Sequence, residues 1–595
     1  MSDSIEHKTT EPEFPNRLVY FLALVFVAVG IINSTPLIPG WDELWRGITG
    51  IEKLKTRTFS TEWFYPFVFS LMMLLVALKH SMWRSWKGTN KAVFGAFMDV
   101  ALVVSALAVS LTYLIEIDSV CLIDLMSGER ARIMAETLKA EIEFAETMGL
   151  PKPDTVEDPK CVSTTGVWLV AIMGSALIVF LGYNIKVWGF PLVAISLGIA
   201  AYTIITVLVW YFHGPDGINK YLVTKLGGEP RTFLDGVPNV HDALVNNASG
   251  FLGRFMHVIM NVVFPYIILG ALFGKSAGGQ TLIKLAFRWT RKLRGGPAHA
   301  AIVSSAMFGT ITGGPIVNVL STGVLTIPMM IKRGFSRVFA GGMEAAASSG
   351  GSIMPPVMGV AAFILAAMTA VPYRDVIIAA TLPALAYFLC LFLSASFQSR
   401  KQGIDAFGEL TDEMHISGQD ILHLCQIILP MLLILVLLLT PKDMVGCGFI
   451  SSLFGADTII ENGRCQVISL PWVFQIFQNA AGDAGATGWW AAALVMVLLF
   501  LDKDFRSKPG KLLDALAESG ITISTLYLMF LAVTVIDVCL NFTGLSKFVA
   551  IDVLRFLLSF DLGGEGAIIF QFLVQTTYKF SLSRLSFIIL FSINY

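Results

Sequence analysis

The chain has 595 residues, of which 55% are hydrophobic and only 14% are charged, and its mean hydropathy is +0.71. Soluble globular proteins carry about 25% charged residues, so this composition excludes an ordinary soluble protein and predicts an all-α polytopic membrane protein. The formal net charge of −1 gives no reason to expect nucleic acid as a partner, and the expected surroundings are a lipid bilayer. The seven cysteines show no metal-ligand spacing, so no zinc site is predicted.

Four apolar runs are predicted to span the membrane in the first part of the chain, after a polar cytoplasmic tail at 1–17. The first run is expected to be a retained span, because no basic run and no small-residue cleavage site mark it as a signal peptide. The loop 79–91 holds four Lys or Arg residues and no acid, which is typical of a cytoplasmic loop. The runs cover 18–33, 63–78, 92–114 and 167–183.

Two loops that are predicted to lie outside contain pairs of cysteines. Residues 116–160 carry eleven acids and five bases, and the alternation of spans places this loop in the periplasm. Cys121 and Cys161 bracket it, and Cys447 and Cys465 lie in a later outside loop. Each pair is a candidate periplasmic disulfide, with two unrelated thiols as the alternative.

The middle of the chain continues the alternation of spans. A fifth apolar run at 189–212 and the polar residues up to 250 are predicted to form a linker helix and a periplasmic segment. The next run, 251–273, returns to the cytoplasm, where residues 284–294 add five bases without an acid. The alternation and the basic loops therefore predict the same orientation.

The stretch 295–359 combines an apolar composition with residues that break helices. No Asp, Glu, Lys or Arg occurs between Arg294 and Lys332, yet the stretch holds twelve glycines and five prolines. Non-helical backbone persists in hydrocarbon only where protein covers it or where it lines a wet cavity. The pattern therefore predicts broken helices around a transport site. Close packing of small residues is the alternative, but it explains the glycines and alanines and not the pair Pro355-Pro356.

The same stretch resembles the large, DctM-like permease subunit of the tripartite ATP-independent periplasmic (TRAP) transporters. The resemblance depends on several linked motifs that occur in one order. They are GGPA at 295–298, GTITG at 309–313 with Asn318, TIP at 326–328, KRGF at 332–335, and ASSGG at 347–351 with Pro355-Pro356. The run PPVMGVAAFILA resembles the fused (DctQM-like) kind, in which the small and large permeases share one chain.

The resemblance implies a fold and a function. Residues 18–188 would form the four-helix small permease, and residues 251–570 would form an inverted-repeat transporter domain with re-entrant hairpins. The implied activity is sodium-coupled secondary active uptake of carboxylate-type solutes across the bacterial inner membrane. A periplasmic solute-binding protein would deliver the solute. A related hairpin-type ion-coupled carrier that works without a binding protein is the alternative.

Within this resemblance, the two predicted breaks supply the candidate site. Sodium is a hard cation that takes oxygen ligands, whereas a substrate carboxylate is held by N–H groups at the N-termini of half-helices. A hydrogen bond back to a helix carbonyl is the alternative for each hydroxyl. The ion-binding candidates are Gly309, Thr310, Thr312, Asn318, Ser348 and Ser349. The substrate-binding candidates are Gly313, Gly314, Ser321, Thr322, Gly350, Gly351, Ser352, Pro355 and Pro356.

A few ionisable residues lie within predicted spans. Glu344 is the only acidic or basic residue in the stretch 338–373, and an intramembrane carboxylate points to a functional site. A snorkelling surface acid is the alternative. Asp99 and Asp537 are candidates for lining a polar cavity, whereas His299 is interpreted as a capping or interfacial residue. No catalytic constellation and no phosphate-binding loop occurs, so neither an enzyme nor an organic cofactor is expected.

The end of the chain departs from the family pattern. Later apolar runs are predicted at 357–368, 376–396, 421–440, 489–501, 520–540 and 548–560. The motif G-M-G-x-P-T of the family's second half is missing, and residues 571–595 contain neither Gly nor Pro. We therefore expect a chain that is truncated near residue 570, with an incomplete second half and an atypical tail. An inactive membrane fragment is a further alternative.

Overall fold

The computed structural model describes residues 17–36, 41–50, 61–116, 167–213, 251–369, 371–406, 416–440 and 472–545, with a few short pieces between them. Several predicted features lie outside these residues. They are the N-terminal tail, the loop with Cys121 and Cys161, Cys447, the side chain of Cys465, most of the predicted span at 548–560, and the tail at 571–595.

The described part of the chain is built from α-helices, which confirms the all-α polytopic fold predicted from composition. Nine of these described helices are long and apolar enough to cross a membrane. Two short antiparallel strand pairs lie in the connections, β1 (Lys225–Leu226) with β2 (Glu229–Pro230) and β3 (Thr458–Glu461) with β4 (Arg464–Val467). The nine spans are Arg17–Ser34, Trp63–Ser85, Ala92–Leu114, Ala171–Trp188, Phe255–Gly274, Tyr373–Lys401, Gly418–Leu439, Ala484–Leu501 and Gly510–Leu540.

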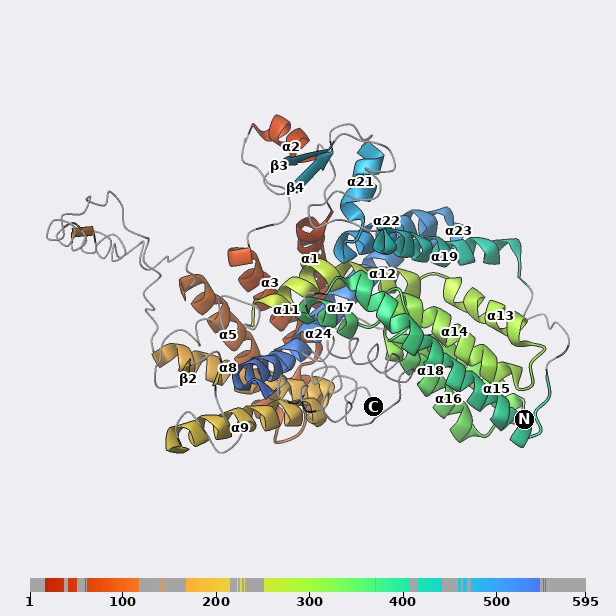
Figure 1. The fold of residues 1–595 in the computed structure, drawn as a ribbon, viewed down its shortest axis with the longest axis horizontal. Coiled ribbons are helices and arrows are strands. Elements are labelled where there is room, and N and C mark those ends of the chain that lie inside the picture. The colour runs from red at the N-terminus through yellow and green to blue at the C-terminus, as the bar shows by residue number, and fades with distance from the viewer. Residues whose placement is uncertain are drawn as a thin grey trace, which may run out of the picture.

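A first group of helices packs around a shared apolar core (Figure 1). It consists of α1 (Arg17–Ser34), α3 (Thr61–Lys79), α5 (Ala92–Glu116) and α8 (Val167–Trp188), with the short α2 (Trp41–Thr49) and α4 (Met82–Ser85) in the connections. Phe69 on α3 meets Phe180 on α8 edge to face, with ring centroids 5.9 Å apart. α9 (Phe190–His213) follows α8 after Gly189, whose φ of 93° glycine adopts readily.

The helix α24 (Gly510–Thr543) packs against this first group, although it comes from the other end of the sequence (Figure 1). Asn184 on α8 donates a hydrogen bond to the carbonyl oxygen of Leu528 at 2.8 Å. Trp188 Nε1 donates to the carbonyl oxygen of Thr525 at 3.1 Å. Such interhelical bonds satisfy polar side chains in an apolar interior, so they tie the first group to the rest of the chain.

The second group of helices fills the centre and the right side of Figure 1. Its centre is formed by α14 (Gly296–Thr312), α15 (Pro315–Lys332) and α16 (Arg337–Gly351), which pack against one another. None of these three is among the nine candidate spans of the described chain. The other helices of this part are α11 (Arg254–Val258), the π-helix η1 (Ile259–Val263), α12 (Phe264–Gly274), α13 (Gly278–Thr290), α17 (Val360–Thr369), α18 (Tyr373–Lys401), α19 (Gly418–Leu439), α21 (Trp472–Ala480), α22 (Ala484–Leu501) and α23 (Lys503–Arg506).

The observed helices differ from the predicted spans mainly at their ends. α24 begins at Gly510 rather than at residue 520, and α22 begins at Ala484 rather than at residue 489. Asp483 caps this helix by accepting a hydrogen bond from Ala486 N at 3.0 Å. A Cβ on Gly488 would lie 3.1 Å from Pro265 Cβ, so the small residue permits close contact with α12.

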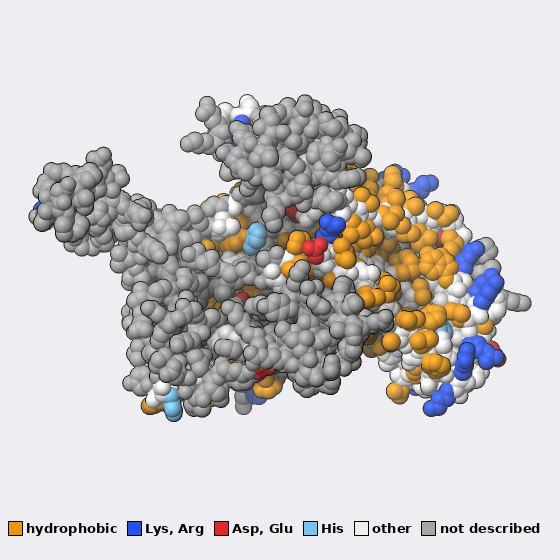
Figure 2. All heavy atoms as spheres, in the orientation of Figure 1, with side chains coloured by type: hydrophobic (Ala, Val, Ile, Leu, Met, Phe, Trp, Pro, Cys, Tyr) orange, Lys and Arg blue, Asp and Glu red, His pale blue; other side chains and the backbone are white. Residues whose placement is uncertain are grey.

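The outer surface of the second group is strongly apolar. Figure 2 shows hydrophobic side chains spread over this part of the molecule, with Lys and Arg side chains gathered at its outer rim. Leu320, Leu382 and Val436 are among the exposed apolar residues of α15, α18 and α19. A continuous apolar surface of this kind is unusual in a soluble monomer but is expected of helices that face lipid chains.

Candidate functional site

The first helix break separates α14 from α15 by only two residues. Gly313 adopts the left-handed conformation with φ 59°, and its N–H donates to Gly309 O at 3.0 Å, which closes α14. Gly314 is extended, and Pro315 occupies the first turn of α15, where the missing N–H of proline costs no helix bond. The Gly-Gly-Pro sequence therefore ends one helix, starts the next and folds the two into a helical hairpin.

The second break follows the C-terminal end of α16. Residues 352–359 lie in turns and irregular backbone before α17 begins. Tyr373 at the start of α18 holds this segment, because its hydroxyl lies 3.0 Å from Pro356 O and 2.6 Å from Val357 O. Met358 takes a φ of 56°, which is uncommon for a residue other than glycine and marks a tightly held turn.

The two breaks touch each other through glycines. A Cβ on Gly313 would lie 1.8 Å from Met358 O, and a Cβ on Gly309 would lie 2.2 Å from the Cα of Gly351. Any larger residue at either position would push the two backbones apart, and at Gly313 it would also have to adopt a left-handed φ. Close packing and broken helices, which were alternatives at the level of the sequence, therefore occur together at this contact.

Glu344 on α16 lies in a buried cluster of hydroxyl groups. Its side chain is 0% exposed, so the alternative of a snorkelling surface acid is wrong. Thr326 Oγ1 donates to its Oε2 at 2.5 Å, and Ser305 Oγ donates to its Oε1 at 3.2 Å. Thr322 also donates to Oε1, and Ser348 Oγ donates to the same oxygen at 3.3 Å. Three helices, α14, α15 and α16, thus surround one carboxylate with four hydroxyls.

Asn318 on α15 completes this arrangement. Its Nδ2 donates to the carbonyl oxygen of Ser305 at 2.8 Å, which leaves its Oδ1 facing Thr322, whose Oγ1 is 3.5 Å away. Asn318 and Glu344 are both 0% exposed. We call this group of side chains the oxygen cluster; its members are Ser305, Asn318, Thr322, Thr326, Glu344 and Ser348.

Helical periodicity explains why the cluster residues converge. Asn318, Thr322 and Thr326 are spaced by four along α15, so they lie on one face of that helix. The two cluster residues of α16 are also spaced by four. Four of the six cluster residues were predicted from the sequence, whereas Thr326 and Ser305 were missed. The regular spacing along α15 could have identified Thr326, whereas Ser305 joins the cluster only through the packing of α14.

Other residues of the predicted site bond locally or contribute only backbone. Thr310 Oγ1 donates to Met307 O at 2.6 Å, and Ser352 Oγ donates to Ser349 O at 2.8 Å, as the back-bonding alternative predicts. The side chain of Thr312 lies outside the described residues. Ser321 lies on α15, and the residues that supply backbone at or beside the two breaks are Gly309, Gly313, Gly314, Gly350, Gly351, Pro355 and Pro356.

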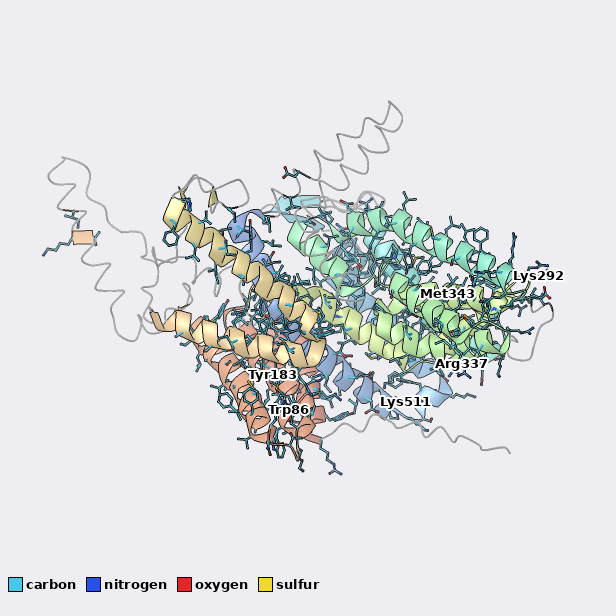
Figure 3. The ribbon with its side chains drawn as sticks, turned by 90° about the horizontal axis from the view of Figure 1, so that it is seen from below. Trp86, Tyr183, Lys292, Arg337, Met343 and Lys511 are labelled. Atoms are coloured by element: carbon cyan, nitrogen blue, oxygen red, sulfur yellow. The ribbon has the colours of Figure 1, made fainter. Side chains whose placement is uncertain are left out.

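Asp99 on α5 has a structural role. It accepts hydrogen bonds from Ser81 Oγ at 2.6 Å and from Met82 N at 2.8 Å, at the start of α4. The hydroxyl of Tyr183 on α8 also donates to it, and Figure 3 places Tyr183 and Trp86 in the first group of helices. These contacts join α4, α5 and α8. Asp99 therefore stabilises the packing of these helices and is not part of the site at the breaks.

The remaining ionisable candidates also lie away from the cluster. His299 on α14 is buried, with Nδ1 3.1 Å from Gly295 O and Nε2 2.9 Å from Ser396 Oγ. Because a carbonyl oxygen only accepts, Nδ1 carries a hydrogen and donates it to Gly295 O. The ring therefore secures the start of α14, in keeping with the predicted capping role. Asp537 is buried on α24.

Comparison with known proteins identifies the same transporter family that the sequence motifs resemble. The family described as "Tripartite ATP-independent periplasmic transporter, DctM component" matches residues 177–559, which is more than half of the chain and includes both breaks and the oxygen cluster.

Three relatives show similarity at 26–29% identity. The protein y4mL of Sinorhizobium fredii is 26% identical over 196 residues, covering 32% of this chain and 46% of the relative. The C4-dicarboxylate TRAP transporter large permease protein DctM of Vibrio cholerae is 26% identical over 159 residues, covering 27% and 35%. The isethionate TRAP transporter permease protein DctMQ of Oleidesulfovibrio alaskensis is 29% identical over 145 residues, covering 24% and 22%.

The chain thus spans less than half the length of each of these three relatives. The family match and the nine candidate spans of the described residues identify a multi-pass protein of the bacterial inner membrane. On the extent of the family match, this chain belongs to the DctM-component family of tripartite ATP-independent periplasmic transporters.

Proposed function

We propose that this chain is the membrane permease subunit of a sodium-coupled secondary transporter, which takes up carboxylate-type solutes delivered by a periplasmic binding protein. Membership of a transporter permease family supports the transport role. Two relatives are named for C4-dicarboxylate and for isethionate, which are both small organic anions. These names support an anionic substrate, for which a carboxylate is our first choice.

The contact between the two helix breaks is the observation that carries this proposal. At each break one helix ends and another begins, α14 and α15 at the first, α16 and α17 at the second. A helix N-terminus presents free N–H groups and partial positive charge, which suit a carboxylate. A helix C-terminus presents free carbonyl oxygens, which suit sodium. The breaks therefore offer opposite partners for a solute anion and its coupling ion within one contact region.

We also propose that the small and large permeases are fused in this chain, with α1, α3, α5 and α8 as the small permease. The family match begins at residue 177, in α8, so the earlier helices precede the DctM component. The name DctMQ of one relative supports such a fused arrangement. In this arrangement, the packing of α24 against the first group would hold the two parts together.

Uptake into proteoliposomes tests the proposed transport. We expect an inward sodium gradient to stimulate uptake of a labelled C4-dicarboxylate, in the presence of a periplasmic solute-binding protein for that anion, over uptake with choline in place of sodium. Asn318→Ala and Ser349→Ala should raise the sodium concentration that gives half-maximal uptake, because each removes an oxygen at or beside the breaks. Gly342→Ala is the control, because a Cβ there would meet nothing within 4 Å.

The outcomes separate the alternatives. Unchanged sodium activation in both variants would remove these two residues from the ion site. Uptake that does not need the binding protein would favour the hairpin-type carrier that works alone. Absence of sodium-stimulated uptake by the wild-type chain would contradict the proposal and favour an inactive membrane protein.

A further inference from the structure

We infer that the oxygen cluster binds one dehydrated monovalent cation, sodium, and that Glu344 is its charged ligand. The inference rests on the proposed sodium coupling and deepens it. It places the ion among side chains of three helices, rather than among the hydroxyls at the tips of the breaks such as Thr310 and Ser352. Three observations carry it, namely a buried carboxyl group without a basic partner, a pattern of hydrogen bonds and the chemistry of the ligands.

The first observation is a buried carboxyl group without a basic partner. Glu344 is 0% exposed, and none of the ion pairs between described residues involves it. Lys332 at the end of α15 and Arg337 at the start of α16 are exposed. His299 on α14 is bonded to a backbone carbonyl and a serine. A buried carboxylate that stays ionised must be paired or bind a cation, so an ionised Glu344 requires a bound positive ion.

The second observation is that the two threonines have a choice of acceptor. Thr326 Oγ1 lies 2.5 Å from Glu344 Oε2 and 3.0 Å from the carbonyl oxygen of Thr322. Thr322 Oγ1 contacts Glu344 Oε1 and lies 2.9 Å from the carbonyl oxygen of Asn318. Each hydroxyl has one hydrogen, so it can make a well-aligned hydrogen bond to only one of these acceptors at a time.

This choice defines two states of the cluster. Without a cation, the threonine hydrogens point to the carboxylate and partly balance its charge. With a cation, the hydrogens turn to the backbone carbonyls, and the hydroxyl lone pairs face the carboxylate. Oxygen lone pairs facing each other at this distance repel unless a positive ion lies beside them. The side chains can therefore switch from solvating the carboxylate to binding an ion with little movement of the helices.

The third observation is that the ligands suit sodium. The cluster supplies one carboxylate, four hydroxyls and the Oδ1 of Asn318, which are hard oxygen ligands, and one positive charge balances its single negative charge. Among the described residues, no group of three or more His, Cys, Asp or Glu side chains is placed to hold a metal ion, so a divalent ion is not favoured. A Cβ on Gly323 would lie 3.2 Å from Glu344 Cγ, so the backbone of α15 packs closely against this side chain.

The location of the cluster links the ion to the breaks. The three helices that supply its ligands are the same helices that end or begin at the two breaks, apart from α17. A cation held by ligands from α14, α15 and α16 would fix these helices relative to one another. Ion binding would therefore set the geometry of the substrate site before the solute arrives.

Binding of labelled sodium to the purified 595-residue chain in detergent tests the inference without requiring transport. The wild-type chain should bind ²²Na⁺, and unlabelled sodium should displace it better than potassium. Glu344→Gln keeps the shape but removes the charge, and it should raise the dissociation constant at least about tenfold. Thr326→Val keeps the shape but removes one hydroxyl, and it should raise the constant roughly three- to tenfold.

Two matched variants serve as controls. Ser304→Ala removes a buried hydroxyl beside Ser305 that bonds only to its own helix, at Ala301 O, 3.2 Å away. Glu518→Gln removes a carboxylate that pairs with Lys275 at 3.1 Å, away from the cluster. Both should bind sodium like the wild type. If Glu344→Gln does not fold, as judged by size-exclusion elution and circular dichroism, the sodium affinities of Thr326→Val and Ser348→Ala test the inference instead. Wild-type affinity in both folded variants would then overturn it.

The inference is overturned if folded Glu344→Gln binds sodium as tightly as the wild type. It is also overturned if the wild type binds no sodium and infrared spectra show a protonated carboxyl group that Glu344→Gln removes, because the cluster would then bind a proton. If sodium binding depends on the oxygen cluster but uptake does not respond to a sodium gradient, the results would support the site and contradict the proposed coupling. The two proposals can thus fail separately.

Discussion

Gly309→Ala is a direct test of the contact that joins the two helix breaks. Gly309 lies inside α14 with ordinary helical geometry, so alanine introduces no strain in φ. Its added Cβ, however, would lie 2.2 Å from the Cα of Gly351 and 2.9 Å from the carbonyl carbon and oxygen of the same residue. These are backbone atoms of α16 and cannot rotate away, so the helices themselves must move.

The required movement can be read from the geometry. Ordinary van der Waals contact begins at 3.4 Å, so α14 and α16 must separate by about 1.2 Å, the difference from 2.2 Å. Such overpacking costs about 1–3 kcal/mol, whereas replacing a helical glycine by alanine gains about 0.5–1 kcal/mol where space allows. Gly342→Ala in α16 has that space, with nothing within 4 Å. The two variants should therefore differ by roughly 2 kcal/mol in the free energy of unfolding.

The same separation should weaken the oxygen cluster. Ser305 reaches Glu344 from α14 at 3.2 Å, and a shift of about 1 Å would take this pair beyond hydrogen-bonding distance. Unfolding by sodium dodecyl sulfate in mixed micelles, followed by circular dichroism, measures the stability, and ²²Na⁺ binding measures the cluster. If Gly309→Ala is as stable as Gly342→Ala and binds sodium normally, the described contact between the breaks is wrong.

Three further predictions concern the scaffold and the orientation. Asp99→Asn should lower the free energy of unfolding by about 1–3 kcal/mol, because a charged acceptor shared by α4 and α8 is lost. Unchanged stability would show that Asp99 does not stabilise the packing of these helices. Ser417→Ala should cost about 1 kcal/mol, because this residue forms the capping box of α19 with Asp420; the same titration measures it, and an unaltered midpoint would contradict the cap. In a cysteine-free background, a membrane-impermeant thiol reagent added outside should label Glu141→Cys and spare Lys87→Cys; the reverse pattern would overturn the predicted orientation.

The sequence was sufficient to predict the kind of protein and the position of its breaks. Few charges and long apolar runs leave the backbone no option in a bilayer other than helices, so the fold class followed from composition. Gly313, Gly314 and Pro315 determine the first break locally, because proline is favoured in the first turn of a helix and glycine readily ends one. These are local effects, which depend on a residue and its immediate neighbours in the chain.

Only the tertiary structure decided which of the polar residues work together. The sequence suggested Thr310 and Asn318 equally as ligands, but Thr310 bonds to its own helix, whereas Asn318 faces the buried Glu344 cluster. Ser305 could not be selected from its neighbours, because its partners lie on two other helices and its inclusion depends on how α14 is rotated against them. That rotation is set by the contact between Gly309 and Gly351. Packing between helices has no local signature in the sequence. The sequence allowed Glu344 to be either a surface-accessible or a buried carboxylate, and the packing of α14, α15 and α16 made it a buried one.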